Sequence, residues 1–269
     1  MVRIARNGLL LVLAVLWLVP TYLLVVNALT PADEYDGSPG WIPEGMGILD
    51  NLAKAWDSAG LGLGIYNSLL YATLSAGIAV LVAALASFAV IVMPVRRRGV
   101  WFWLIYSGTL LPLQVFLAPL FKAYVQVAIY DTQLGMVLVY AALCVPFAFF
   151  MVRNYLTTVE TEITEAAQLD GAGWYRLFWR IHIPIAKSSL LAAFAFQFTW
   201  VWNDLLFGIT LSTSPNIRPV MAALAEVNGG YSNLGPPVAL AAALAVSLPT
   251  VILFLAVQPL FRSSLKPAG

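Results

Sequence analysis

Six long apolar segments alternate with polar stretches along this chain of 269 residues. A helix that crosses a lipid bilayer needs about 20 predominantly apolar residues. Segments of this kind lie near residues 9–29, 66–93, 101–121, 134–152, 188–211 and 237–258. The pattern predicts an all-α integral membrane protein in which about six transmembrane helices form a single domain.

The first apolar segment has two possible interpretations. It follows Arg3 and Arg6 and extends from Gly8 to Leu29, and Val26-Asn27-Ala28 near its end has the small residues of a signal-peptidase site. The apolar region of a signal peptide is only about 7–15 residues long. The longer run favours an uncleaved first span over a cleaved signal.

The segment 30–64 is acidic and contains several prolines and glycines, with Lys54 as its one basic residue. We predict an extracytoplasmic loop here, with a short helix over 49–59. Its spaced glycines do not form a phosphate-binding loop, because no Gly-Lys-Ser/Thr accompanies them.

The polar segment 153–187 is too highly charged to cross a bilayer, because each charged residue at the bilayer centre costs roughly 2.5–3.5 kcal/mol. Apolar residues nevertheless recur in it at helical spacing, which predicts two short amphipathic helices joined by a glycine turn. The first set is Val159, Ile163, Ala166 and Ala167, and the second is Trp174, Leu177, Phe178 and Ile181. Gly171 and Gly173 lie between the two sets, and Pro184 is expected to end the second helix. Arg176 and Arg180 are expected to anchor this segment at the membrane surface, and His182 to fill space there.

Basic residues indicate the orientation, since Lys and Arg beside spans accumulate on the cytoplasmic side. Placing Arg96-Arg97-Arg98 inside puts eleven of the fourteen Lys and Arg residues on the cytoplasmic side. Only Lys54, Lys122 and Arg218 then lie outside. Both termini and the segment 153–187 are predicted to be cytoplasmic.

Composition agrees with the hydropathy pattern: 61% of residues are hydrophobic, 10% are charged, and the mean hydropathy is +0.86. Soluble domains are about 45–50% apolar and about 25% charged. With Cys144 as the one cysteine, an intramolecular disulfide is excluded. A net charge of +1 without a basic, aromatic-interleaved patch gives no indication of nucleic-acid binding.

Motifs for catalysis and for metal or nucleotide binding are missing from the sequence. There is no P-loop, no G-x-S-x-G elbow and, with His182 as the one histidine, no H-E-x-x-H zinc motif. We therefore predict neither catalytic nor metal-binding residues and no cofactor in this chain. Any energy that its function requires would come from a partner or from an ion gradient.

Two apolar segments contain candidate residues for a substrate path. Gln114 lies between Pro112 and Pro119, and broken helices with polar residues at depth often mark such a path, although a packing kink is an equal alternative. The fifth segment contains the candidates Phe196, Gln197, Trp200, Asn203 and Asp204, and it also contains Phe207. All except Gln197 would share one face of a continuous helix.

Aromatic faces beside amide and carboxylate groups suit a sugar, whose C–H face stacks on rings and whose hydroxyls pair with polar groups. The alternative for Asp204 is a bond to neighbouring spans, since a carboxylate at membrane depth faces the bundle interior or water. One possible function is an ion-driven carrier with Asp204 as its cation site. Another is a membrane enzyme, but the sequence has no plausible nucleophile–base pair.

The segment 153–187 resembles a known family. Glu165-Ala166-Ala167, three residues, Gly171, nine residues and Ile181-x-Ile183-Pro184 match the EAA loop of ABC importer permeases, with Ile183 where leucine is usual. Asp170-Gly171-Ala172 resembles the carbohydrate (maltose-type) subgroup. So do Asn67-Ser68-Leu69, Asp131-Thr132 and Trp202-Asn203-Asp204, and the similarity covers most of residues 10–260. The tail, ending Leu265-Lys266-Pro267-Ala268-Gly269, departs from the glycine-rich tail of the subgroup.

The resemblance implies a transport subunit of a bacterial or archaeal cytoplasmic membrane. Its partners would be a second homologous permease, two cytosolic ATPase subunits that bind ATP and Mg²⁺, and an extracytoplasmic substrate-binding (lipo)protein. The first short helix would dock in a cleft of the ATPase, where Ala166 and Ala167 allow close approach. Glu165 would pair with an arginine, and Gly171 would allow a turn where a Cβ would clash. From spacing alone, Glu165 is equally well a solvated helix charge.

Overall fold

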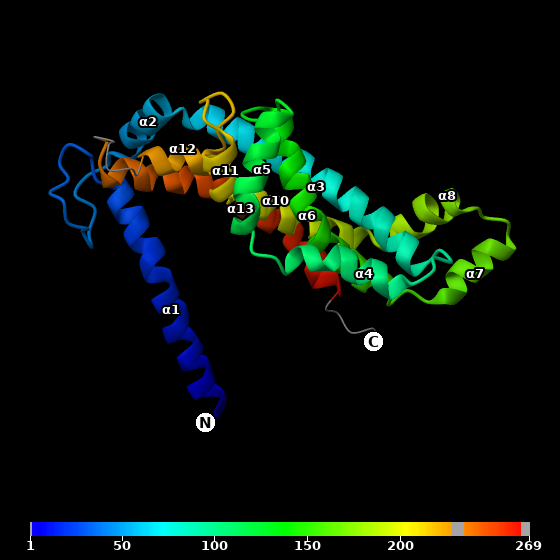
Figure 1. The fold of residues 1–269 in the computed structure, drawn as a ribbon. Coiled ribbons are helices and arrows are strands. Elements are labelled where there is room, and N and C mark those ends of the chain that lie inside the picture. The colour runs from blue at the N-terminus through cyan, green and yellow to red at the C-terminus, as the bar shows by residue number, and fades with distance from the viewer. Residues whose placement is uncertain (1, 228–233, 265–269) are drawn as a thin grey trace. The chain divides into compact units, whose positions relative to one another are not determined.

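The computed structural model describes residues 2–227 and 234–264, and helices with short connections form this part of the chain, without a strand. The described residues divide into two compact units. The first contains residues up to Ile65 together with Val220–Pro249, and the second contains Tyr66–Pro219 together with the chain from Thr250 onward. Figure 1 shows the order of the helices.

The first unit contains α1 Val2–Leu29, α2 Ile48–Ala59 and α12 Val220–Val227. Helix α13 Pro236–Ser264 begins in the first unit and continues into the second. The second unit contains most of α3 Leu61–Ile91, then α4 Arg98–Tyr106, the 3₁₀ turn η1 Ser107–Thr109, α5 Gln114–Gln126 and α6 Gln133–Leu156. It continues with α7 Thr161–Leu169, α8 Trp174–Arg176, the π-helix η2 Leu177–His182, α9 Ile183–Ile185, α10 Lys187–Trp202 and α11 Leu206–Leu211.

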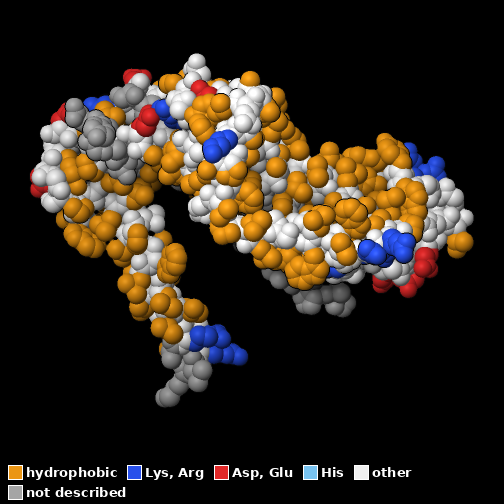
Figure 2. Space-filling model, in the orientation of Figure 1, with side chains coloured by type: hydrophobic (Ala, Val, Ile, Leu, Met, Phe, Trp, Pro, Cys, Tyr) orange, Lys and Arg blue, Asp and Glu red, His pale blue; other side chains and the backbone are white. Residues whose placement is uncertain are grey.

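Four described helices are long and apolar enough to cross a membrane, and up to six spans result if each of two bent helix pairs forms one span. The four correspond to the predicted first, second, fourth and sixth spans, and they are α1, α3, α6 and α13. Hydrophobic side chains cover much of the visible surface, as expected where lipid replaces water (Figure 2). The prediction of an all-helical membrane protein is confirmed.

The predicted third span differs from a single kinked helix. Helix α4 with η1 and helix α5 meet at an angle of 91°, and the break lies between Thr109 and Gln114. Pro112 is within this break, where it has no N–H to continue the helical hydrogen bonds. Pro119 and Pro146, in contrast, lie inside α5 and α6 without interrupting either helix.

In the first unit, the predicted extracytoplasmic segment is organised around α2, which agrees closely with the predicted helix over 49–59. Asn51 is fully buried, and its amide donates to the carbonyls of Ala28 (3.1 Å) and Thr30 (2.8 Å) while its oxygen accepts the N–H of Ala32 (3.2 Å). One amide therefore satisfies three backbone groups where the chain leaves α1.

In the core of the second unit, small residues let α3 approach α6 closely. Ala72, Ala76, Ala79 and Ala83 of α3 are all fully buried, and they recur at helical spacing. Two hydroxyls of α3 donate to α6, from Ser75 to the Val137 carbonyl (3.0 Å) and from Ser87 to the Phe149 carbonyl (3.3 Å). Close packing and interhelical hydrogen bonds of this kind hold helices together in lipid.

A hydrogen-bonded clasp, formed by Asp131 and residues 213–214, joins the α5–α6 corner to the chain after α11. The Asp131 carboxylate accepts the backbone N–H of Thr213 (2.8 Å) and of Ser214 (3.0 Å) and also the Ser214 hydroxyl. Asn67 and Tyr71 of α3 donate to carbonyls a few residues further along, at Asn216 (2.9 Å) and Ile217 (2.7 Å). Partial burial opposes ionisation of Asp131, but the hydrogen bonds outweigh it and lower its pKa.

We expect Asp131→Ala to destabilise the clasp by about 1–2 kcal/mol, because several donors lose their acceptor. Asp131→Asn should cost less, since Asn retains one acceptor oxygen and tolerates the positive φ of 55° at this position. Because the folded-state pKa lies below the ordinary 3.8, the contribution of the carboxylate is complete above that pH and is lost as the pH falls through the folded-state pKa. Amide hydrogen exchange of residues 213–218 measures the stability of the clasp. Unchanged protection of these amides in Asp131→Ala would contradict the expectation.

Candidate functional site

Helices α7 and α8 lie together at one end of the second unit (Figure 1). Helix α7 ends in a Schellman motif: the N–H of Ala172 bonds to the Ala167 carbonyl (2.9 Å), and the N–H of Gly171 bonds to the Gln168 carbonyl (3.0 Å). Gly171 has a φ of +79°, and a Cβ there would have no neighbour within 4 Å. The backbone conformation, and not a clash with a neighbour, therefore makes glycine favourable at this turn.

The second predicted helix is present but irregular. It begins at Trp174, widens into a π-helix over Leu177–His182 and continues through Pro184 to Ile185. Pro184 was expected to end this helix, yet the chain stays helical through it. The wider turn just before Pro184 shifts the carbonyls that its ring would otherwise strike. The chain then bends by 74° into α10.

The inner side of this two-helix segment packs on the bundle. Leu177 and Phe178 are buried among residues of α3 and α6, and the Phe178 ring meets the Phe88 ring edge to face with centroids 5.3 Å apart. The Tyr155 hydroxyl at the end of α6 donates to the Ile185 carbonyl (3.0 Å). A force applied to the segment would therefore reach α3 and α6 through packed side chains and not through slack chain.

The four apolar residues predicted to share one face of the first helix divide between two environments. Val159 and Ala167 pack against the buried cluster of α3 and α6. Ile163 is 40% exposed, and Ala166 is exposed as well. Ile163 and Ala166, three residues apart, therefore form an outward apolar ridge. The sequence pattern did not distinguish this ridge from the inner face.

The outer face of α7 combines this apolar ridge with charge. Leu169 continues the ridge at 90% exposure, and Glu165 and Asp170 beside it are also exposed. Sequence reasoning missed Leu169; the signal was its position three residues after Ala166 on the same helical face. Charged side chains of both signs gather at this end of the unit in Figure 2. An exposed apolar ridge beside acidic groups is typical of a docking surface.

Beyond the turn, Tyr175 and Trp179 are exposed and lie next to the exposed Arg176 and Arg180. Aromatic and basic side chains together are characteristic of the membrane–water interface. The predicted anchoring role of the two arginines fits this arrangement. Ile181 and Pro184, the last residues of the motif, contribute to the packed and the exposed side respectively.

His182 joins three elements. Its ring is 4% exposed, its Nε2 lies 3.2 Å from the Thr164 hydroxyl of α7, and it meets the Phe88 ring of α3 edge to face. Within the described residues its Nδ1 has no hydrogen-bond partner. Burial lowers the pKa of His182 below its ordinary 6.5, so the neutral form is favoured. It is thus a packed structural residue at the base of α7.

Thermal stability of the segment should fall as the pH drops below 6.5. Under those conditions the unfolded chain protonates His182 while the folded chain resists the charge, and the loss ends once the folded-state pKa is passed. His182→Gln should remove this part of the pH dependence. Melting curves of the two proteins between pH 5 and 8 provide the measurement, and parallel curves would contradict the prediction.

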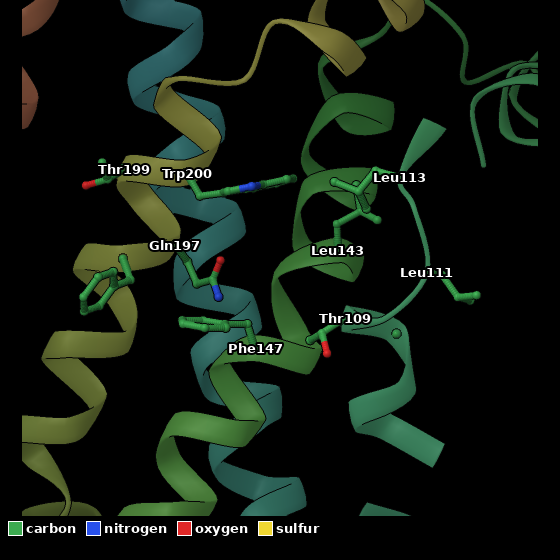
Figure 3. A pocket seen from close by; sticks show the side chains of 10 residues that line it. Thr109, Leu111, Leu113, Leu143, Phe147, Gln197, Thr199 and Trp200 are labelled. Carbon is green, nitrogen blue, oxygen red and sulfur yellow. The ribbon is translucent and has the colours of Figure 1, made fainter. Parts of the chain in front are cut away.

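A cavity of about 410 Å³ lies in the second unit between α10, α6 and the break after α4. Its volume is in the range of small-molecule sites. The residues that line it are Gly108, Thr109, Leu111, Leu113, Leu143, Phe147, Phe196, Gln197, Thr199 and Trp200. In Figure 3 the side chains of Gln197, Trp200 and Phe147 point into the space between the helices.

Three of the six predicted substrate-path residues line this cavity, namely Phe196, Gln197 and Trp200. The expected single helical face is wrong, because α10 ends at Trp202 and a new helix begins at Leu206. Gln114 is exposed at the start of α5, and Asn203 is exposed, with its amide donating to the Thr199 carbonyl (2.7 Å).

Asp204 explains the break. Its Oδ2 accepts the backbone N–H groups of Phe207 (3.0 Å) and Gly208 (3.2 Å), so it caps the first turn of α11. The same oxygen accepts the hydroxyl of the fully buried Tyr140 on α6 (2.9 Å). These contacts are the structural pairing with neighbouring elements that was the alternative to a lining role.

Several apolar helices, a packed two-helix segment at one end and a cavity between the helices agree with an integral membrane transport subunit. The chain belongs to the family of binding-protein-dependent transport system inner membrane components, whose model matches residues 79–266.

Similar proteins agree with this membership, and a solved structure shares the fold. The α-glucoside transport system permease protein AglG of Rhizobium meliloti (strain 1021) is 30% identical over 81% of this chain and 59% of its own length. The melibiose/raffinose/stachyose import permease protein MelC of Bacillus subtilis (strain 168) is 27% identical over 92% of this chain and 89% of its own length. A bacterial ABC transporter for import of the acidic polysaccharide alginate contains a chain with the same fold, with a TM-score of 0.78, 18% identity and 95% coverage of both chains.

Proposed function

We propose that this chain is the permease subunit of an ATP-driven, binding-protein-dependent importer of a sugar or oligosaccharide. The observation that carries the proposal is the outer face of α7, where Glu165, Ala166 and Leu169 are exposed on a helix whose other side is packed against the bundle. A surface that is rigidly joined to the spans and open to a partner is what a coupling element needs.

In this function the outer face of α7 docks in a cleft of a cytosolic ATPase subunit. Ala166 allows the close approach, Glu165 pairs with a basic group of the ATPase, and the turn at Gly171 sets the direction of the second helix. Closure of the ATPase pair on ATP then moves α7, and the packed residues Leu177 and Phe178 transmit the movement to α3 and α6. The spans alternate between inward-facing and outward-facing states.

The complete transporter contains a second, homologous permease, two ATPase subunits that hold ATP and Mg²⁺, and an extracytoplasmic substrate-binding (lipo)protein. This chain supplies neither a nucleotide site nor catalysis. Both of its termini and α7 lie on the cytoplasmic side of a bacterial or archaeal inner membrane. Eleven of the fourteen Lys and Arg residues fall on that side in this orientation, which supports it.

The names of the relatives support a sugar as the cargo, since AglG and MelC are described as permeases for α-glucosides and for melibiose, raffinose and stachyose. The cavity supports it too, because aromatic rings and an amide line its wall. We assign Phe196, Gln197 and Trp200 to the substrate path. Gln114, Asn203 and Asp204 lie outside that cavity wall, and Asp204 has a structural role.

Uptake measurements with two inhibitors test the energy source. Vanadate, which blocks ABC ATPases, should abolish uptake in cells that depend on this chain, whereas a protonophore at constant cellular ATP should leave it nearly unchanged. The opposite result would favour the ion-driven carrier. Deletion of the ATPase subunit is the matched control and should eliminate uptake as completely as deletion of this chain.

A further inference from the structure

The cavity beside α10 has a wall that is aromatic and uncharged. Three aromatic rings, from Phe147, Phe196 and Trp200, contribute to it, and Gln197 contributes an amide. None of the residues that line it carries a charge. The cavity therefore has groups that recognise a neutral polar molecule and none that would neutralise an anion.

Gln197 is the polar centre of this wall. Its side chain is 4% exposed, and its Nε2 has no hydrogen-bond partner among the described residues. A buried N–H donor without a partner lowers the stability of the protein unless a ligand accepts its hydrogen bond. The wall also has the hydroxyls of Thr109 and Thr199 and the indole N–H of Trp200. The Thr199 hydroxyl already donates to the Ala195 carbonyl (2.8 Å).

The arrangement in Figure 3 places the Trp200 and Phe147 rings on either side of the Gln197 amide. A saccharide ring has apolar C–H faces and a polar edge of hydroxyls. The aromatic rings fit the faces. The amide fits the edge, because its NH₂ group can donate a hydrogen bond to a sugar hydroxyl and its oxygen can accept one from a sugar hydroxyl. A phosphate or carboxylate group only accepts, and its charge would lose water without gaining a cation.

We propose that this wall selects an uncharged saccharide, with Gln197 as the specificity-determining hydrogen-bonding residue and Trp200 as its stacking platform. The inference rests on the proposed import function and adds the class of cargo to it. A sugar phosphate, a uronic acid oligomer or another anionic sugar is excluded from this subsite.

Uptake by whole cells with and without this chain tests the class of cargo. The probes are radiolabelled neutral sugars (maltose, melibiose, raffinose) and anionic ones (glucose 6-phosphate, glycerol 3-phosphate, a galacturonic acid oligomer). Loss of vanadate-sensitive uptake for neutral probes only supports the inference. Loss for any anionic probe, or for none of the probes, overturns it. ATP-driven uptake of an anionic probe would leave the proposed import function intact, whereas vanadate-insensitive uptake would contradict that function itself.

Variants of Gln197 test the residue, with the transported neutral sugar as the probe. Gln197→Ala should raise the KM of uptake by about tenfold, the equivalent of about 1.4 kcal/mol, with the maximal rate and the yield of assembled complex little changed. Gln197→Glu removes the donor and should raise KM at least as much. The control is Gln126→Ala, an exposed glutamine at the end of α5 outside the cavity wall.

A role of Gln197 in packing alone would lower the amount of complex and the maximal rate together, and that result would overturn the assignment. So would a KM for Gln197→Ala equal to that of Gln126→Ala. Trp200→Phe keeps a ring and should raise KM less than Trp200→Ala. Equal effects of the two Trp200 substitutions would remove the stacking role.

Discussion

Replacement of Ala166 by Trp should reduce the amount of ATPase that co-purifies with the permease by at least about tenfold, which corresponds to about 1.4 kcal/mol. Ala166 is exposed at the centre of the outer face of α7, between Ile163 and Leu169. A bulky indole there would prevent close approach of another backbone, while the inner face of α7 would keep its packing. Leu169→Asp should act in the same direction, because it puts a charge on the apolar ridge.

The control for this prediction is Ala123→Trp, a substitution of an exposed alanine of α5. It adds the same bulk far along the chain from α7 and should leave ATPase recovery unchanged. Pull-down from detergent extracts, normalised to the permease, gives the measurement. Full recovery with Ala166→Trp would contradict docking through this face.

Substitutions of Asp204 should separate a structural role from an ion-carrying one. Asp204→Ala leaves the buried Tyr140 hydroxyl and the N–H groups of Phe207 and Gly208 without their acceptor. We expect a loss of about 2–4 kcal/mol in stability, since each unsatisfied buried group costs about 1–3 kcal/mol and the effects are not additive. Thermal unfolding of the purified protein measures it.

Asp204→Asn retains an acceptor oxygen but not the charge. It should keep most of the thermal stability and most of the uptake, because hydrogen bonding to Tyr140 and to the start of α11 continues. A carrier that binds its coupling ion at Asp204 would lose uptake in the Asn variant while remaining folded. That combination of results would contradict the structural role.

Hydropathy predicted the fold class correctly because insertion into a bilayer is decided locally. About 20 apolar residues are sufficient for a span whatever they pack against. Helices α1, α3, α6 and α13 follow the predicted segments, although the start of α1 and the end of α13 extend about two turns beyond them. The motif beginning at Glu165 likewise predicted family membership, since its spacing spans one continuous stretch of chain.

The third and fifth predicted spans are each divided into two helices, a feature that hydropathy does not indicate. Apolar residues continue through the first break, where Pro112 removes a backbone donor. In the second break the carboxylate of Asp204 competes for backbone donors. Whether a side chain such as Asp204 caps a new helix depends on Tyr140, which is more than sixty residues away in the chain. No local pattern includes that partner.

The sequence by itself determined that this chain is an α-helical membrane subunit of a binding-protein-dependent transport family with a patterned polar segment at 153–187. Those properties depend on residues close together in the chain, through insertion energy and helical period. Only the tertiary structure decided which side of α7 is packed and which is exposed, and that Gln197 and Trp200 share a cavity with Phe147 while Asp204 does not. These properties depend on contacts between helices, which arise when segments distant in the chain compete to bury the same surface.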